Sequence, residues 1–182
     1  MTCIIGLETD DGVWIGADSA GTDTSYGAQT IRADTKVFKR GPVLMGFCGS
    51  YRMGQLLRYQ LEMTNQPDGM PDYEYMVRHF IEDARKCLKS GGFTWVEKNT
   101  ETGGQFLVAY KDKLYGIEED FQVGMSTRSY QCIGSGGDYA SGAMAALVSD
   151  EDLTEAQKIK KALKIAADHD AYVAAPFKVM KL

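Results

Sequence analysis

The chain opens with two apolar runs separated by a short polar turn. Residues 1–7 and 12–18 are apolar on both faces of a strand, and the Asp-Gly pair between them is a strong hairpin signal. Strands that are apolar on both faces suit a sheet that is covered on both sides. We therefore expect a buried hairpin, with helices on one face and another sheet on the other.

A polar, glycine-bearing segment follows this hairpin. Residues 21–32 carry few large apolar side chains, so we expect a loop near a site or a neighbouring subunit. Residues 35–39 and 43–48 then predict a second hairpin, which turns at residues 40–42.

The remaining pattern predicts helices and strands in turn. We expect a helix around residues 56–61, a helix from about residue 72 to 91, strands at 105–110, 113–117 and 130–133, a helix at 139–148, a helix after Thr154 and a strand at 177–182. Thr154 and Gln157 have the spacing of a capping box. Two stacked sheets with helices outside would bury every apolar face. The expected fold is α+β, a four-layer α-β-β-α sandwich in one domain over residues 1–182.

Composition narrows the classes of function. The 182 residues are 44% hydrophobic and 25% charged, which suits one domain with a sizeable core. The net charge of −5 gives no electrostatic reason to bind nucleic acid or an anionic membrane. No apolar stretch approaches the roughly 20 residues that span a bilayer, and the N-terminus lacks a signal-peptide pattern, so we expect a cytoplasmic protein. Four scattered cysteines and two histidines suggest neither a metal site nor a cofactor.

Turn geometry places a carboxylate beside Thr2. If the first hairpin turns at its Asp-Gly pair, Asp18 lies opposite or next to Thr2, with Cβ atoms about 4.5–5.5 Å apart. The second hairpin sets Lys36 opposite residues 46–48, one step from Gly49. These four residues would converge only if the two hairpins share a sheet, and sequence spacing does not establish that.

Several short motifs follow one another in a fixed order. They are Thr2 behind Met1, Ile15-Gly16-Ala17-Asp18, Lys36-Val37, Gly46-Phe47-Cys48-Gly49 and Ile133-Gly134-Ser135-Gly136-Gly137 with Tyr139-Ala140. Together they resemble the proteasome β-subunit and HslV peptidase family of N-terminal nucleophile hydrolases, over most of the chain.

The resemblance implies a mechanism that needs no histidine. Thr2 Oγ would be the nucleophile, and the α-amine freed by removal of Met1 would be the base. An α-amine titrates near pH 7.7–8.0, so a neutral fraction is available in the cytoplasm. Lys36 would lower the pKa of the amine and hydroxyl by its charge, and Asp18 would hold and neutralise Lys36.

The same resemblance assigns supporting roles. The backbone N–H of Gly49 would stabilise the oxyanion, Ser135 would relay the proton of the amine, and Asp168 would support Ser135 or the terminus. Proteasome subunits carry a serine three residues after this late aspartate, whereas this chain has Ala171. HslV proteins also lack that serine, which favours the HslV branch.

Substrate and partners are implied in the same way. The family alignment places Gly21, Phe38, Phe47, Tyr51 and Met53 at the substrate, and the bulk of Phe47 suggests a shallow side-chain pocket. The resemblance also implies a homo-oligomeric ring around the sites. Peptides or unfolded proteins would be the substrates, supplied by an ATP-dependent unfoldase.

Each of these residues also has an ordinary structural interpretation. Threonine is common after an initiator methionine, Asp18 could end a strand, Lys36 could be a solvated edge lysine, and residues 134–137 could be a strand-to-helix turn. Two other functions stay open. One is an amidohydrolase of the same fold that acts on a small amide, and the other is a non-catalytic ring subunit that retains Met1.

Overall fold

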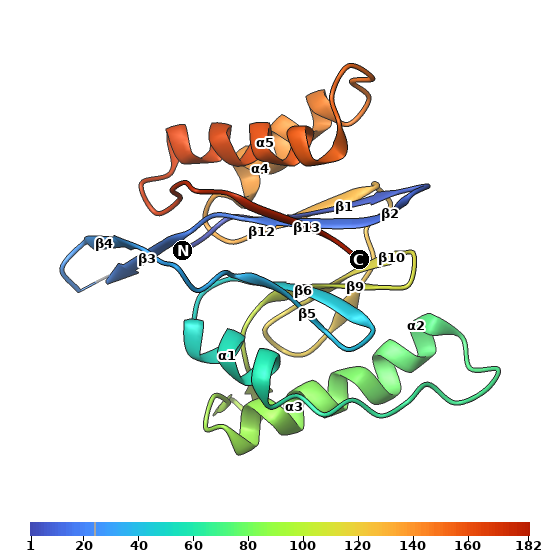
Figure 1. The fold of residues 1–182 in the computed structure, drawn as a ribbon. Helices are drawn as coiled ribbons and strands as arrows, with labels where there is room; N and C mark the ends of the chain where they lie inside the picture. Colours follow the sequence, from blue (N-terminus) through green and yellow to red (C-terminus); the bar gives the residue numbers. More distant parts are fainter. Residues whose placement is uncertain (24) are drawn as a thin grey trace.

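Two β-sheets lie face to face in the computed structural model, which describes residues 1–23 and 25–182 (Figure 1). The first sheet has the order β12-β1-β2-β13 and the second β11-β10-β9-β6-β5, with antiparallel neighbours throughout. The first is built from β1 (Ile4–Thr9), β2 (Gly12–Ala17), β12 (Tyr130–Ile133) and β13 (Lys178–Lys181). The second is built from β5 (Val37–Arg40), β6 (Val43–Phe47), β9 (Phe106–Tyr110), β10 (Lys113–Ile117) and β11 (Val123–Gly124).

Helices cover both outer faces of this pair of sheets (Figure 1). The first sheet carries α4 (Gly137–Leu147) and α5 (Glu155–His169), and the second carries α1 (Tyr51–Tyr59), α2 (Asp72–Tyr75) and α3 (Ile81–Ser90). A π-helical turn, η1 (Met76–Phe80), joins α2 to α3, so the helix expected from residue 72 to 91 is continuous. The capping box of α5 is present as predicted. The four-layer α-β-β-α sandwich is thus confirmed.

Three apolar layers hold the sandwich together. Ile4, Ile15 and Leu107 belong to the layer between the sheets, while Ile5 and Leu163 belong to the layer between the first sheet and its helices. A larger cluster, which includes Phe38, Met53 and Phe80, fills the space between the second sheet and its helices. Strand alternation explains the division, because successive residues of β1 face opposite layers.

Two short hairpins were not expected from the sequence. β3 (Ala20–Asp23) pairs with β4 (Ala28–Ile31) inside the segment predicted to be a loop, and β7 (Trp95–Glu97) pairs with β8 (Thr100–Thr102). Every residue of β4 is exposed, so this ribbon has no apolar face that a hydrophobic pattern could reveal. Residue 24, within the predicted loop, lies outside the described residues.

Within residues 1–23 and 25–182, no helix has the length and apolar content needed to cross a membrane.

Candidate active site

The register of the first hairpin brings Asp18 to the start of β1. Ile4 pairs with Ala17, so Cys3 and Asp18 come opposite one another. The backbone N–H of Asp18 donates to the Cys3 carbonyl at 3.3 Å, and the Cys3 N–H donates to Asp18 Oδ1 at 3.1 Å. The predicted position of Asp18, next to Thr2 across the hairpin, is confirmed.

Lys36 reaches the same carboxylate from the other sheet. It immediately precedes β5, and its Nζ lies 2.7 Å from Asp18 Oδ1, with both side chains at most 1% exposed. The expectation that the two hairpins must share a sheet is wrong. The hairpins stack face to face, so the ends of two different sheets meet at this ion pair.

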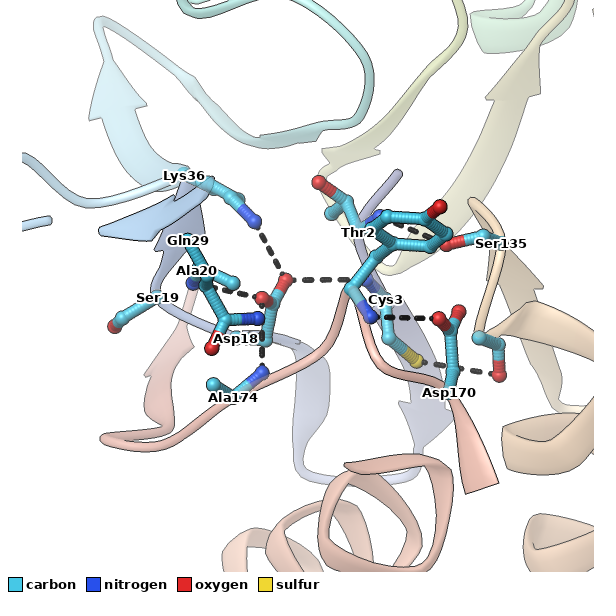
Figure 2. A network of polar contacts seen from close by, with 12 residues as sticks. Thr2, Cys3, Asp18, Ser19, Ala20, Gln29, Lys36, Ser135, Asp170 and Ala174 are labelled. Atoms are coloured by element: carbon cyan, nitrogen blue, oxygen red, sulfur yellow. Dashed lines mark hydrogen bonds and ion pairs between the residues drawn. The ribbon is translucent and has the colours of Figure 1, made fainter. Parts of the chain in front are cut away.

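Four donors surround the Asp18 carboxylate. Oδ1 accepts from Cys3 and Lys36, and Oδ2 accepts from the N–H groups of Ala20 at 2.9 Å and Ala174 at 3.4 Å (Figure 2). A buried carboxylate is tolerated when its oxygens are hydrogen-bonded in this way. Burial lowers the pKa of the Lys36 ammonium, while the charge of Asp18 opposes that shift. The ion pair of Lys36 and Asp18 thus holds one positive and one negative charge in fixed, buried positions at the candidate site.

The turn after β12 holds Thr2 in place. The Thr2 N–H donates to Ser135 Oγ at 3.1 Å, and the Gly136 N–H donates to the Thr2 carbonyl at 3.1 Å. Gly134 has a φ of +91°, and a Cβ at this residue would collide with the Thr2 carbonyl oxygen. Glycine is therefore required there. Thr2 is only 1% exposed, and Figure 2 shows its side-chain oxygen directed toward Lys36, away from Ser135.

Gly49 lies two residues after the end of β6, the strand that pairs with β5 next to Lys36. The Phe47 N–H donates to the Lys36 carbonyl at 3.1 Å, which fixes this strand end beside the lysine. Gly49 has a φ of +82°, a backbone conformation that suits glycine. Its N–H donates to no other group in the part of the chain that the structure describes.

Asp168 does not join this group, contrary to the sequence prediction. It lies in the last turn of α5, exposed to solvent, and forms an ion pair with Lys164 one turn earlier on the same helix. The helical period turns residues 164 and 168 to the same outer face, so Asp168 supports neither Ser135 nor the terminus.

Asp170, which the sequence reasoning missed, lies closer to the candidate site than Asp168 does. It ends α5, half-buried, and Figure 2 shows it beside Cys3. Its Oδ1 accepts from the Tyr172 N–H at 2.8 Å, while its buried Oδ2 has no hydrogen-bond partner among the described residues. Its charge contributes to a raised pKa of Cys3, whose main cause is burial. An aspartate after the last helical residue commonly accepts a hydrogen bond from the N–H two residues on, and this preference of Asp170 is the signal that could have identified the turn.

The predicted substrate residues separate into two groups. Phe38 and Met53 are 2% and 0% exposed and belong to the core cluster that packs under α1. Phe47 and Tyr51 line a cavity of ≈ 80 Å³, and the Tyr51 ring centroid is 5.8 Å from Lys36 Nζ. Gly21, in β3, lies against Tyr51 and Arg32.

The cysteines near Thr2 are poor nucleophiles. Burial raises the pKa of Cys48 to about 11 and of Cys132 to about 12, and it also raises that of Cys3. All three thiols therefore stay protonated at neutral pH. Across the described ranges, no three His, Cys, Asp or Glu side chains are grouped so as to hold a metal ion.

Solved structures with this fold come from several bacteria and a protist. They include Thiobacillus denitrificans BPH in complex with epoxomicin (TM-score 0.79, 19% identity, 100% of this chain and 99% of that chain). They also include HslV from Trypanosoma brucei (TM-score 0.69, 19% identity, 98% of each chain) and Anbu from Yersinia bercovieri (TM-score 0.67, 16% identity, 98% of this chain and 80% of that chain). At these identities the likeness concerns the fold alone. The sequence model of the proteasome subunit family, however, matches residues 1–182, and the chain therefore belongs to the proteasome subunit family.

Proposed function

We propose that this chain is a threonine-type endopeptidase in which Thr2, after removal of Met1, supplies both nucleophile and base. The observation that carries the proposal is the continuous set of contacts from Ser135 through Thr2 and Cys3 to Asp18 and Lys36. It joins a hydroxyl-bearing residue near the N-terminus to a buried ammonium that is held by a carboxylate.

The chemistry follows from these positions. The free α-amine of Thr2 takes the proton of its own Oγ, which attacks the carbonyl carbon of the scissile amide. The ammonium of Lys36 favours the developing negative charge at Oγ, because the two lie in a buried, weakly screened site. The backbone N–H of Gly49 stabilises the oxyanion, and Ser135 Oγ stays within hydrogen-bond distance of the amine.

The second half of the reaction reuses the same groups. The protonated α-amine gives its proton to the leaving amine of the substrate, and the C–N bond breaks to leave an ester on Thr2. Water, activated by the same amine, then hydrolyses the ester and restores the hydroxyl. No group other than those of this chain and water is needed to balance the steps.

Membership in the proteasome subunit family supports a homo-oligomeric ring that encloses the sites. Peptides or unfolded proteins are the proposed substrates, and an ATP-dependent unfoldase is the proposed partner. Native mass spectrometry tests the ring, because a monomer would contradict enclosure and would favour hydrolysis of a small, freely diffusing amide instead.

The decisive experiment compares three forms of the protein on fluorogenic peptides. The first is protein whose intact mass confirms a free Thr2, the second is Thr2→Ala without Met1, and the third retains Met1. We expect cleavage by the first form only, with a loss of at least about 10³-fold in the other two. Thr100→Ala, at the exposed first residue of strand β8, is the matched control and should cleave at the wild-type rate.

Two outcomes would contradict the proposal. Thr2→Ala that cleaves as fast as wild type excludes Thr2 as nucleophile, and equal activity of the form that retains Met1 excludes the α-amine as base. Epoxomicin, which the Thiobacillus denitrificans structure holds, provides an independent probe and should block cleavage by the processed protein.

A further inference from the structure

The Met1–Thr2 peptide bond leads directly into the buried part of the molecule. Met1 is 36% exposed, whereas Thr2 is 1% and Cys3 is 0% exposed. The proposed function requires hydrolysis of this bond, because the nitrogen of Thr2 is an amide as long as Met1 is attached, and an amide nitrogen does not act as a base. An enzyme that removes Met1 would therefore have to reach a bond whose following residues are inside the protein.

Hydrogen bonds hold the backbone just after this bond. The Thr2 N–H donates to Ser135 Oγ at 3.1 Å, and the Thr2 carbonyl accepts from the Gly136 N–H at 3.1 Å. The Cys3 N–H donates to Asp18 Oδ1 at 3.1 Å, and the Cys3 carbonyl accepts from the Asp18 N–H at 3.3 Å. Both backbone polar groups of each residue are thus engaged inside the molecule. A peptidase that binds these groups must first break the hydrogen bonds that hold them.

Neighbouring strands also hold this segment. Strand β1, which starts two residues after Thr2, lies between β12 and β2 in the first sheet. The turn after β12 lies so close to Thr2 that a Cβ on Gly134 would be 2.3 Å from the Thr2 carbonyl oxygen. Peptidases bind the chain on both sides of the scissile bond, because this aligns the bond with their catalytic groups. The chain could enter such a cleft only after the start of β1 has separated from β12 and the turn that follows it.

We infer that an aminopeptidase specific for methionine must remove Met1 before β12 and the following turn close over Thr2, and that a chain that folds with Met1 attached stays latent. The reaction is hydrolysis of an amide. The oxygen of water bonds to the carbonyl carbon of Met1, the C–N bond breaks, and the nitrogen of Thr2 takes a proton to become the free α-amine. The order of trimming and folding rests on burial and hydrogen bonding, whereas the latency rests on the proposed function.

This order sets the share of active subunits during synthesis. Ser135 and Gly136 come late in the sequence, so Met1 stays accessible while the preceding residues are made. Once these two residues have packed against Thr2, an aminopeptidase no longer reaches the bond. Slow trimming or fast folding would therefore leave a permanent fraction of latent subunits.

The test uses full-length protein that retains Met1, made in a host whose methionine aminopeptidase is inhibited, and a purified methionine aminopeptidase. Intact mass reports the loss of Met1, and a synthetic peptide of residues 1–10 corrects for the activity of the aminopeptidase in each buffer. Without urea, we expect the folded protein to be trimmed at least about 100-fold more slowly than the peptide, because the hydrogen bonds of Thr2 and Cys3 must open first. Just above the midpoint of urea unfolding, the protein should be trimmed within about threefold of the peptide rate.

Ser135→Ala distinguishes the local contacts from enclosure of the site in a ring. It removes the acceptor of the Thr2 N–H, so we expect the folded variant to be trimmed about two- to fivefold faster than the unsubstituted protein with Met1. Enclosure in a ring would slow both proteins equally. Ser149→Ala, at an exposed position after the end of α4, is the matched control and should be trimmed at the rate of the unsubstituted protein.

Four results would overturn the inference. They are trimming of the folded protein within about threefold of the peptide rate, loss of Met1 without added aminopeptidase, resistance of the unfolded chain, and an unchanged rate in Ser135→Ala. The proposed function is judged separately, on the trimmed protein after it has refolded. If that protein cleaves no peptide, the proposed function and the latency fail, while the order of trimming and folding stands.

Discussion

At the scale of single residues, Asp18 is the group on which the site depends. It lies 2.7 Å from Lys36 Nζ, and neither side chain is more than 1% exposed. Its neutral replacement would leave a buried ammonium with no compensating charge. We expect Asp18→Asn to lower the free energy of unfolding by about 3–5 kcal/mol, measured by urea denaturation.

A second aspartate serves as the control for this prediction. Asp34 also pairs with a basic residue at 2.7 Å, but its side chain is 42% exposed and that of Arg32 is 38% exposed. Because solvent screens that pair, Asp34→Asn should cost less than about 1 kcal/mol. Equal losses in the two variants would show that burial of Asp18 and Lys36 contributes nothing.

Hairpin turns predicted that Asp18 lies beside Thr2 and that Lys36 lies one step from Gly49, whereas the convergence of these residues and the role of Ser135 were implied by the family resemblance. Sequence reasoning chose Asp168 where the structure brings in Asp170. Both lie at the end of α5, and the choice depends on where the helix stops. Asp168 was selected from the family resemblance, and the spacing of apolar residues did not show that the helix turns this residue outward while Asp170 follows the helix end.

At the scale of elements, the close approach of the two sheets depends on Gly46 in β6. A Cβ there would lie 2.7 Å from Ile4 Cγ2 and 2.8 Å from Ile15 Cγ2. We expect Gly46→Ala to cost about 1–3 kcal/mol, because the opposite sheet must shift or its side chains must leave their preferred rotamers. The measurement is the midpoint of urea unfolding.

Gly142, on the exposed side of α4, provides the opposite case. A Cβ there would contact nothing within 4 Å, and alanine favours the helix more than glycine does. Gly142→Ala should therefore stabilise the protein by about 0.5–1 kcal/mol. A destabilised Gly142→Ala, or an unchanged Gly46→Ala, would contradict this account of the two glycines.

Elements with an apolar face were predictable, and elements without one were not. Both long hairpins and the helix that starts at Asp72 followed from the spacing of apolar residues. β4 and β7 are exposed along their whole lengths, so neither has a buried face that the spacing of apolar residues could predict. The π-helical turn η1 was equally hidden, because one widened turn barely changes the apolar stripe.

At the scale of the whole molecule, the sequence predicted the number of layers but not which hairpin belongs to which sheet. Turn geometry fixes partners within a hairpin, whereas stacking depends on contacts such as that of Lys36 with Asp18, between residues without local pairing. The sequence alone therefore did not predict that the two sheets meet at the candidate site.

The partly buried Cys132 predicts how the stability of the molecule responds to alkali. Burial raises the pKa of Cys132 to about 12, against about 9 for an exposed thiol. The contribution of the protonated Cys132 thiol to the free energy of unfolding is therefore complete below pH 9. It is lost as the pH rises toward 12, because the thiol of the unfolded chain releases its proton at a lower pH than the thiol of the folded chain. We expect wild type to lose about 2 kcal/mol more than Cys132→Ala between pH 9 and pH 11 in urea titrations. Parallel losses in the two proteins would contradict the assignment to Cys132.

The first sheet also has a consequence for the order of synthesis. β1 and β2, made first, lie between β12 and β13, and Asp18 accepts a hydrogen bond from the N–H of Ala174. A chain still emerging from the ribosome lacks the strands that flank the Thr2 hairpin, and it lacks Ser135 until three-quarters of its length has been made. An incomplete chain thus carries Thr2 without Ser135 and without the strands that flank its hairpin. If Thr2 acts as proposed, cleavage cannot begin until the strands that flank its hairpin have been made.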